Sequence, residues 1–258
     1  MTDWAFVTGG GGDIGGAVCA SLSRDGFHIA CVDMVQERAE QVAKSIRDAG
    51  GNAVALCANV TDPEAVTRVA AEAQSLGPIR VLVNTAGKAH GRSIFDMDYA
   101  TWRADFAANV DSAFLCIQAL REPLLASSGS IVNIASVNGI GVFGFPGYSA
   151  AKAALIHLTK SLAVEFGPSG LRVNAVAPGT VRTRAWNPRL EANPRVFDEL
   201  QALCPLPRIS TGKDVADAVS FLVSDRASMI TGTVVTVDGG LSAGTPSHSK
   251  AVTQQGRG

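Results

Sequence analysis

The sequence predicts an α/β fold with one domain, in which a mainly parallel sheet carries helices on both faces. Short apolar runs alternate with longer amphipathic stretches along the chain, a pattern typical of parallel strands joined by helical crossovers. A length of 258 residues suits one domain of this class and is enough to bury a sizeable core. The sequence shows neither an internal repeat nor an interdomain linker.

We expect the elements in a regular order within one domain, residues 1–242. Strands are expected at residues 4–8, 28–33, 53–57, 80–84, 130–135, 172–177 and 233–237. Helices are expected at residues 14–25, 36–49, 63–75, 99–125, 148–166 and 213–224. Residues 243–258 are small and polar, with scarcely any apolar side chain to anchor them, so we expect a mobile C-terminal tail.

A glycine-rich turn joins the first expected strand to the first expected helix. Glycines stand at positions 9, 10, 11, 12, 15 and 16, and Val18 and Leu22 give the following helix an apolar face. Glycine has no Cβ, so the backbone N–H groups of such a turn can approach a pyrophosphate, and the helix N-terminus favours negative charge. The turn therefore predicts a phosphate-binding site.

The second expected strand, residues 28–33, ends in Asp33. An acidic side chain about 20 residues beyond the glycines is typical of dinucleotide sites, where it accepts hydrogen bonds from the adenosine ribose. Glycine-rich turns are common on their own. The strand, turn, helix and acidic residue together predict dinucleotide binding.

A tyrosine and a lysine four residues apart occur later in the chain. In a helix over residues 148–166, Tyr148 and Lys152 lie one turn apart on one face. An ammonium beside a phenol lowers the pKa of the tyrosine, which suits proton transfer at an alcohol or carbonyl oxygen. Taken alone, the pair is equally compatible with an ordinary solvated helix face.

These motifs together resemble the short-chain dehydrogenase/reductase family over about residues 3–243. The family's Thr-Gly-x-x-x-Gly-x-Gly corresponds to residues 8–15, its Asn-x-Ala-Gly to residues 84–87, and its Tyr-x-x-x-Lys to residues 148–152. The resemblance implies an α/β, doubly wound Rossmann-type domain with a parallel seven-stranded sheet in the order 3-2-1-4-5-6-7. Ligands then bind at the carboxyl ends of the strands.

The resemblance also implies the site residues. The expected catalytic residues are Asn109, Ser136, Tyr148 and Lys152. The expected dinucleotide-binding residues are Gly9, Gly12, Asp13, Ile14, Asp33, Asn59, Val60, Asn84, Ala86, Gly87, Tyr148, Lys152, Pro178, Gly179, Val181 and Thr183. In this assignment Tyr148 exchanges a proton with the substrate oxygen, and Lys152 lowers its pKa and binds the nicotinamide ribose. Ser136 donates a hydrogen bond to the substrate oxygen, and Asn109 orders a water that passes the proton outward.

Two positions depart from the family pattern. Asp13 stands where the family has a glycine. We expect its carboxylate to cap the first helix, because a negative charge aimed at a phosphate is unfavourable. Asn59 stands where the family has an aspartate near the adenine, and its amide can still hydrogen-bond an adenine edge.

The charges near the turn favour NAD over NADP. A 2′-phosphate needs a cation just after the second strand or beside the glycine turn. The turn carries none, and Asp33 is followed by Met34 and Val35. A carboxylate repels that phosphate and suits a free diol, so the predicted cofactor is NAD, with Arg38 the nearby residue that opposes this prediction.

The substrate is expected to lie under the loop after Gly179, about residues 180–212, which covers the substrate in the family it resembles. Its arginines either pair locally on a solvated loop or clamp an anionic group such as a carboxylate, sulfonate or phosphate. The candidate substrate-binding residues are Ser136, Asn138, Tyr148, Arg182, Arg184, Trp186 and Arg189. Lys88 and His90 are expected to be exposed loop residues.

Composition argues against several other classes of function. A formal net charge of −1 without a basic block gives no electrostatic support to nucleic-acid binding. The five cysteines and four histidines lack metal-ligand spacing, so we expect no metal site and a reducing compartment. The chain starts on its first strand, and glycines and prolines interrupt the charge-free span 123–151. We therefore expect a cytoplasmic protein without a signal sequence or membrane helix.

The leading hypothesis is reversible hydride transfer between NAD and a secondary alcohol or ketone that is a sugar, polyol or hydroxy acid, anionic if the loop arginines bind it. A second hypothesis is a 3-oxoacyl thioester reductase, and a third is a non-catalytic NAD-binding regulator on the same fold. The resemblance implies a homotetramer formed through the helix at 148–166, the helix before it and the chain end.

Overall fold

The computed structural model describes residues 2–254, and their seven strands form one parallel sheet. The strands are β1 (Trp4–Thr8), β2 (His28–Asp33), β3 (Ala53–Cys57), β4 (Ile79–Asn84), β5 (Ser130–Ile134), β6 (Arg172–Pro178) and β7 (Val234–Val237). Their order is β3-β2-β1-β4-β5-β6-β7. The predicted fold class and strand order are confirmed, and each strand lies within about one residue of its predicted bounds.

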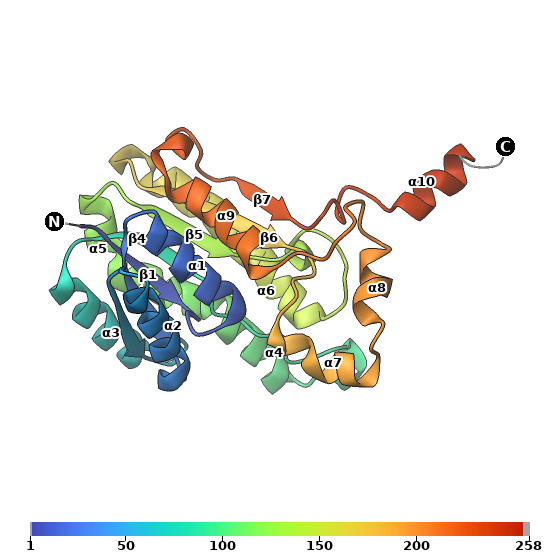
Figure 1. Ribbon diagram of the computed structural model, residues 1–258, viewed down its shortest axis with the longest axis horizontal. Helices are drawn as coiled ribbons and strands as arrows, with labels where there is room; N and C mark the ends of the chain where they lie inside the picture. Colours follow the sequence, from blue (N-terminus) through green and yellow to red (C-terminus); the bar gives the residue numbers. More distant parts are fainter. Residues whose placement is uncertain (1, 255–258) are drawn as a thin grey trace.

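Helices cover both faces of the sheet (Figure 1). On one face α1 (Asp13–Arg24) packs against α2 (Gln36–Asp48) and α9 (Gly212–Val223). On the other face α5 (Ser112–Ala126) packs beside α3 (Pro63–Leu76), and α4 (Tyr99–Phe106) packs beside α6 (Pro146–Phe166). Within residues 2–254, none of the helices combines the length and the apolar character that crossing a membrane requires.

Two apolar layers, one on each side of the sheet, hold these helices in place. Ala5 and Val7 of β1 belong to the layer under α1, α2 and α9, whereas Phe6 belongs to the layer under α3 and α5. Successive strand side chains point to opposite faces, so neighbouring residues of one strand enter different layers. All three are fully buried, as expected for a parallel sheet covered on both sides.

The helix expected at residues 99–125 is interrupted. It consists of α4, a π-helical turn at Ala107–Asp111, and α5. A π-helical turn inserts one extra residue and often marks a functional position. Asn109 lies within this turn and is buried. The segment Ala-Ala-Asn-Val-Asp fits an ordinary helix, so the sequence pattern did not locate the turn.

The segment after β6 contains short helices that the sequence pattern did not predict. We call residues 184–201 the lid; it comprises η5 (Arg184–Trp186), α7 (Asn187–Ala192) and α8 (Val196–Gln201). Single turns of 3-10 helix elsewhere are η1 (Ile94–Asp96), η3 (Val137–Gly139), η4 (Gly167–Ser169) and η6 (Asp225–Ala227).

The C-terminal segment forms α10 (Pro246–Thr253), which buries no residue and extends away from the domain (Figure 1). Helix α10 was not predicted from the sequence. The expected mobility of residues 243–258 stays a prediction, and its last part, residues 255–258, lies outside the described residues.

Candidate active site

The turn between β1 and α1 is built so that only glycine fits it. Gly9 has a φ of 61°, in the left-handed region. A Cβ on Gly15 would lie 2.1 Å from the carbonyl oxygen of Gly9. Helix α1 begins after Gly12, which has no side chain to cap it. The first N–H groups of α1 therefore open onto a bare backbone cradle, which suits an anionic group such as a pyrophosphate.

Asp33 is fixed beside this turn at the end of β2. Its Oδ2 accepts a hydrogen bond of 3.0 Å from the N–H of Gly11, and its Oδ1 accepts one of 3.0 Å from the N–H of Val35. Each carboxylate oxygen keeps a further lone pair that can accept from a ribose hydroxyl. The exposed Arg38 packs its stem against Gly11, since a Cβ on Gly11 would lie 2.5 Å from the Cβ of Arg38. A carboxylate and a cation thus border the same edge of the turn.

The predicted adenine end is bordered by Asn59 and the buried Val60. The Oδ1 of Asn59 accepts hydrogen bonds from the backbone N–H of Thr61, at 3.1 Å, and from its hydroxyl, at 2.9 Å. With that oxygen engaged, the Nδ2 hydrogens of Asn59 are the groups it can offer to an adenine nitrogen.

Buried polar side chains tie the end of β1 to the end of β4. The Oγ1 of Thr8 accepts from the N–H groups of Thr85, at 3.1 Å, and Ala86, at 3.2 Å. The Nδ2 of Asn84 donates to the Oδ1 of Asn133 at 2.8 Å. Asn84 is therefore held inside the sheet, where it fixes the segment that carries Ala86 and Gly87.

Tyr148 and Lys152 lie one helical turn apart on α6, at the carboxyl end of β5. The Nζ of Lys152 is 5.6 Å from the centre of the Tyr148 ring and donates a hydrogen bond of 2.7 Å to the carbonyl oxygen of Ile134. Lys152 is only 3 % exposed. The predicted helical stacking of the two side chains is present, with the ammonium tied to the end of the strand.

Burial dominates the acidity of this pair. It raises the pKa of Tyr148, a hydrogen bond with Ser136 opposes that rise, and the negative charge of Asp105 adds to it. Burial also lowers the pKa of Lys152 to about 7. The sequence led us to expect that Lys152 lowers the tyrosine pKa. In the structure the pKa of Tyr148 is raised instead, mainly because burial desolvates the phenol, and it is Ser136 rather than Lys152 that opposes the rise.

Ser136 follows β5 directly and faces the start of α6. Its hydroxyl accepts from the N–H of Asn138 and donates to the Oδ1 of Asn138, both at 3.2 Å. The Nδ2 of Asn138 donates to the carbonyl oxygen of Gly144, at 2.9 Å, and to the hydroxyl of Ser149, at 3.1 Å. Asn138 therefore links Ser136 to the start of α6, and its assignment to the substrate stays a prediction.

Asn109 joins the same site from the π-helical turn. Its Nδ2 donates to the carbonyl oxygens of Lys88, at 2.7 Å, and Asp105, at 2.8 Å. A Cβ on Gly87 would lie 2.6 Å from the Oδ1 of Asn109 and 3.2 Å from the Nζ of Lys152. Two of the expected catalytic side chains thus meet over the bare backbone of Gly87, and this close approach requires glycine.

Sequence reasoning missed Asp105, and it did not foresee the backbone conformation of Phe145. Phe145 precedes α6 with a φ of 54°, a strained conformation for a bulky residue. Asp105 is fully buried on α4, and its Oδ1 accepts from the N–H of His90, at 2.8 Å, and from the His90 ring, at 3.0 Å. Its position four residues before Asn109, on the same helix face, is the signal that could have identified it. His90 is an exposed loop residue, as expected, and its backbone N–H and ring are hydrogen-bonded to Asp105.

The residues after β6 occupy the opposite side of the site. Pro178 ends the strand, and a Cβ on Gly179 would lie 2.8 Å from the Cβ of Asp238. Val181 is buried and pairs with Ser210 in a single parallel bridge. Thr183 precedes η5 and is partly exposed. These contacts position the beginning of the lid against the carboxyl end of β6.

Three arginines, Arg182 just before the lid and two within it, have different environments. Arg182 stacks on the ring of Phe197 at 4.2 Å. Arg189 lies 4.7 Å from the centre of the Trp186 ring and 5.4 Å from that of Phe145. Arg184 points to the glycine turn, where its Nε donates to the Oδ1 of Asp13 at 2.6 Å. Arg189 thus lies near Phe145, three residues before Tyr148. Arg184, which the sequence assigned to the substrate, instead contacts the glycine turn.

The expected role of Asp13 is also wrong. Asp13 is the first residue of α1 and makes no capping contact, because Gly12 is the N-cap. Both of its carboxylate oxygens accept hydrogen bonds from Arg184, one from the guanidinium and one from the backbone N–H. A partner 171 residues away satisfies this carboxylate, which is information that local sequence does not contain.

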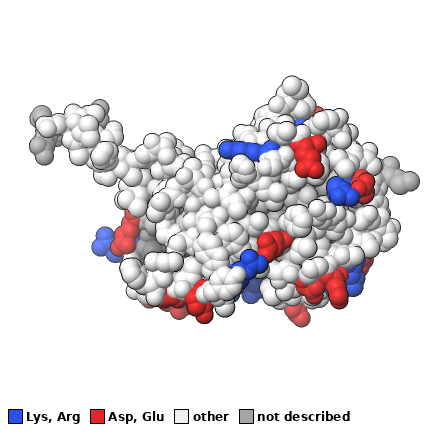
Figure 2. Space-filling model, turned by 180° about the vertical axis from the view of Figure 1, so that it is seen from behind, with Lys and Arg blue, Asp and Glu red and all other residues white. Residues whose placement is uncertain are grey.

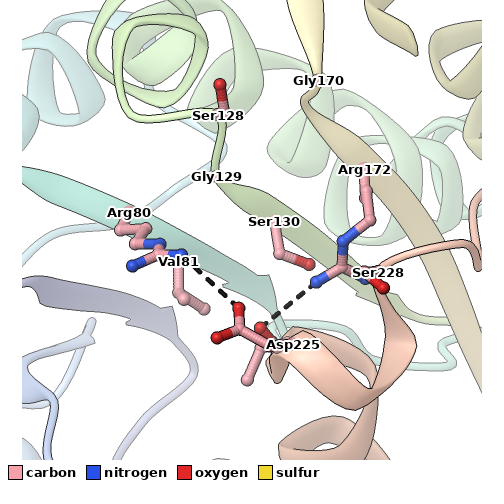
Figure 3. Close-up of a pocket in the computed structure, with 10 residues that line it drawn as sticks. Arg80, Val81, Ser128, Gly129, Ser130, Gly170, Arg172, Asp225 and Ser228 are labelled. Atoms are coloured by element: carbon pink, nitrogen blue, oxygen red, sulfur yellow. Dashed lines mark hydrogen bonds and ion pairs between the residues drawn. The ribbon is translucent and has the colours of Figure 1, made fainter.

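The hollow shown in Figure 3 lies at the amino ends of β4, β5 and β6, at the opposite edge of the sheet from Tyr148. Arg172 donates there to the carbonyl oxygens of Leu222, Val223 and Ser224 at the end of α9. Arg80 lies within ion-pair distance of Asp3 and Asp225. Cations at helix C-termini offset the negative end of the helix dipole. These arginines therefore stabilise the fold, and the hollow faces away from Tyr148.

Among residues 2–254 no three His, Cys, Asp or Glu side chains gather as a metal site would require.

Comparison with known proteins places this geometry among oxidoreductases. The family described as Enoyl-(Acyl carrier protein) reductase matches residues 11–242. The 2-(S)-hydroxypropyl-CoM dehydrogenase 3 of Xanthobacter autotrophicus is 37% identical over 92% of this chain and 95% of the relative. Galactitol 2-dehydrogenase (L-tagatose-forming) of Cereibacter sphaeroides is 36% identical over 92% of this chain and 93% of the relative. A crystal structure of a putative NAD(P)-dependent gluconate 5-dehydrogenase from Beutenbergia cavernae with bound NADP superposes with a TM-score of 0.86. It is 33% identical and covers 93% of this chain and 97% of that chain.

Proposed function

The chain belongs to the short-chain dehydrogenase/reductase family of oxidoreductases, which act on alcohols or ketones, and from this membership we propose that it transfers a hydride between NAD and a secondary alcohol or ketone. The observation that carries the proposal is the meeting of Ser136, Tyr148 and Lys152 at the carboxyl end of β5, with Asn109 over Gly87. Ligands of open parallel sheets bind at this edge.

The residues around the glycine turn fit a dinucleotide. The side-chain-free cradle at the start of α1 suits the pyrophosphate, and the Asp33 carboxylate suits the ribose diol. We propose NAD rather than NADP, because the Oδ2 of Asp33 is held 3.0 Å from the backbone nitrogen of Gly11, where the carboxylate would repel a 2′-phosphate. The nearby cation, Arg38, is exposed to solvent. The Beutenbergia cavernae structure holds NADP, so the cofactor preference of this chain is tested separately from its catalytic residues.

The side chains then divide the proton chemistry among them. The dinucleotide supplies the hydride acceptor or donor. The Tyr148 phenol gives its proton to the carbonyl oxygen during reduction and takes one from the hydroxyl during oxidation, while Ser136 holds that oxygen by a hydrogen bond. Because the pKa of Tyr148 is raised, the phenol is protonated at neutral pH, and oxidation gains from higher pH. Lys152 and Asn109, which meet over Gly87, lie where that proton can leave toward the π-helical turn.

The substrate we propose is a sugar, polyol or hydroxy acid, and Arg189 supports an anionic one. Its guanidinium lies over Trp186 of the lid and near Phe145, three residues before Tyr148. Among the described residues, no carboxylate lies within ion-pair distance of it. A guanidinium held by aromatic rings keeps its N–H groups available for a carboxylate, sulfonate or phosphate.

A 3-oxoacyl thioester reductase is the second candidate, favoured by the similarity to the 3-oxoacyl-(acyl carrier protein) reductase of Staphylococcus aureus, which is 36% identical over 93% of this chain. A panel of hydroxy acids, sugar acids and polyols with NAD, run against acetoacetyl thioesters with NADH and NADPH, separates the two. Faster turnover of the thioesters would make the second candidate the better one.

We propose a homotetramer as the assembly. Figure 2 shows the face opposite to that of Figure 1, on which charged side chains are sparse and separated by broad uncharged areas. Phe114 of α5 is 46% exposed and Val164 of α6 is 80% exposed. Apolar side chains exposed on neighbouring long helices suit a helix-to-helix contact between copies of the chain.

Replacement of Tyr148 by Phe tests the catalytic proposal. NAD binding, followed by tryptophan fluorescence, should stay within about twofold, since only one hydroxyl is removed. Turnover of the best substrate should fall by about a hundredfold to ten-thousandfold. Near-normal turnover would remove Tyr148 from the mechanism. NAD binding without turnover of any substrate in the wild-type protein would favour the non-catalytic regulator.

A further inference from the structure

Arg184 joins the lid to the glycine turn by three hydrogen bonds. Its backbone N–H donates to the Oδ2 of Asp13 at 2.6 Å, and its Nε donates to the Oδ1 at 2.6 Å. Its Nη2 donates to the carbonyl oxygen of Gly11 at 3.0 Å. Each of these bonds has one charged partner, and the bond from Nε joins a cation to a carboxylate, which makes them stronger than neutral ones. The contact links the first residue of α1 to the first residue of η5.

Asp13 needs this partner because of where it stands. As the first residue of α1, it lies beside the cradle proposed for the pyrophosphate. An unpaired carboxylate there would repel the phosphates, whereas a paired one is close to neutral. The two residues are partly exposed, with 57% of the Arg184 side chain and 30% of the Asp13 side chain accessible, so the effect of the pair is moderate rather than large.

The lid is otherwise held mainly by its own contacts. Trp186 of η5 packs on Phe197 of α8, with ring centres 5.4 Å apart, and Arg182 stacks on the same Phe197 ring. The ring contact joins η5 to α8 within the lid. The position of the lid relative to the glycine turn depends on Arg184, and its position relative to Tyr148 depends on the contact of Arg189 with Phe145.

We propose that Asp13 and Arg184 are positioning residues that tie the substrate lid to the dinucleotide turn. The pair neutralises the charge next to the pyrophosphate, and it holds Arg189 beside Tyr148. This inference rests on the proposed function, since it assigns the turn to NAD and the lid to the substrate. It predicts that loss of Arg184 weakens the binding of both NAD and substrate, whereas loss of Asp13 weakens the binding of substrate alone.

Three variants separate these effects. Arg184→Ala leaves Asp13 unpaired, so the NAD dissociation constant should rise by about three- to tenfold, and the KM of the substrate should rise as well. Asp13→Gly removes the charge and the tie, so NAD should bind about as tightly as to the wild type while the KM rises. In the double variant, NAD affinity should return to within about twofold of the wild-type value, with the KM still raised.

Arg195→Ala is the matched control, because Arg195 is an exposed lid arginine that bonds the side chain of Asn193 through its backbone N–H alone. It should leave NAD affinity and KM unchanged. Amide hydrogen exchange of residues 184–201 gives a readout that needs no ligand. Exchange in the free protein should be faster in Arg184→Ala and Asp13→Gly than in the wild type and Arg195→Ala.

The outcomes distinguish this inference from the proposed function. Absence of NAD binding to the wild type would overturn the proposed function. Amide hydrogen exchange of residues 184–201 would still test whether Asp13 and Arg184 hold the lid against the glycine turn. Equal NAD affinities of Arg184→Ala and the double variant would overturn the neutralising role. Unchanged KM and unchanged lid exchange in all three variants would overturn the positioning role.

Discussion

Asp105 holds His90 with one carboxylate oxygen, and its other oxygen is buried without a partner among the described residues. A Cβ on Gly147, the residue before Tyr148, would lie 2.6 Å from that second oxygen. A buried charge so close to α6 acts on the phenol through a poorly screened path. It contributes to the raised pKa of Tyr148.

Replacing Asp105 by Asn should therefore shift the pH profile of alcohol oxidation to lower pH. Oxidation requires the ionised phenol, so the rate rises as the pH passes the pKa of Tyr148. Loss of the Asp105 charge lowers that pKa, so the midpoint should move to lower pH. Profiles of kcat/KM against pH measure it. His90→Gln removes the ring donor that offsets the charge and should move the midpoint the other way. Parallel shifts of both variants would contradict the electrostatic explanation.

Lys152 should make folding stability depend on pH. Burial lowers its pKa to about 7 in the folded protein, against an ordinary value of 10.5. Between these values the unfolded chain binds more protons than the folded one, so stability rises with pH from about 7 to 10, by up to ~1.4 kcal/mol per pH unit. Urea unfolding across this range should show the slope in the wild type and a weaker one in Lys152→Met. Lys44→Met, which removes an exposed lysine paired with Asp48, should keep it. An unchanged slope in Lys152→Met would show that Lys152 is protonated when folded.

The fold was predictable because its signals are local and repeated. Every strand is a short apolar run such as residues 4–8, and each is followed by a turn or a periodic helix. Hydrophobic periodicity therefore located the strands and the long helices. The glycine turn could be interpreted for the same reason, since Gly9 and Gly15 meet conformational demands that only glycine satisfies.

The remaining features depend on contacts between distant segments. Asp13 was assigned to a helix cap because its partner, Arg184, is 171 residues away. The π-helical turn at Asn109 leaves no mark in the residue pattern. The raised pKa of Tyr148 reflects burial created by the surrounding elements, which the spacing of Tyr148 and Lys152 does not reveal. Sequence pattern identified the side chains, whereas their electrostatics required the packed structure.

Asp33 should determine the choice between NAD and NADP. In Asp33→Asn the negative charge is lost while the side chain keeps its shape, so a 2′-phosphate is no longer repelled and Arg38 can attract it. We expect the ratio of kcat/KM for NADP to that for NAD to rise by about tenfold or more. The Asp33→Asn, Arg38→Ala double variant should lose most of that gain. A wild-type preference for NADP of tenfold or more would show that the NAD proposal is wrong.

Arg189 should determine how well anionic substrates bind. Arg189→Met removes the charge but keeps an apolar side chain against Trp186 and Phe145. We expect the KM of a hydroxy acid to rise by about tenfold to a hundredfold, because a hydrogen bond to a charged group contributes about 1.5–3 kcal/mol. The KM of a neutral polyol should change by less than about twofold. Arg195→Met is the control, and equal losses with acidic and neutral substrates would indicate a structural role for Arg189.

Val164 should lie in the contact between copies of the chain. It is 80% exposed on α6, and burying such a side chain stabilises an assembly by about 1.5–3 kcal/mol per copy. Val164→Glu replaces that gain by the desolvation of a charge, so light scattering should show dimers or monomers where the wild type is a tetramer. Phe221→Glu serves as the control, because Phe221 is 37% exposed on α9, which packs beside α1 on the other face of the sheet. A Val164→Glu protein that assembles like the wild type would place the contact elsewhere, and a monomeric wild type would contradict the tetramer itself.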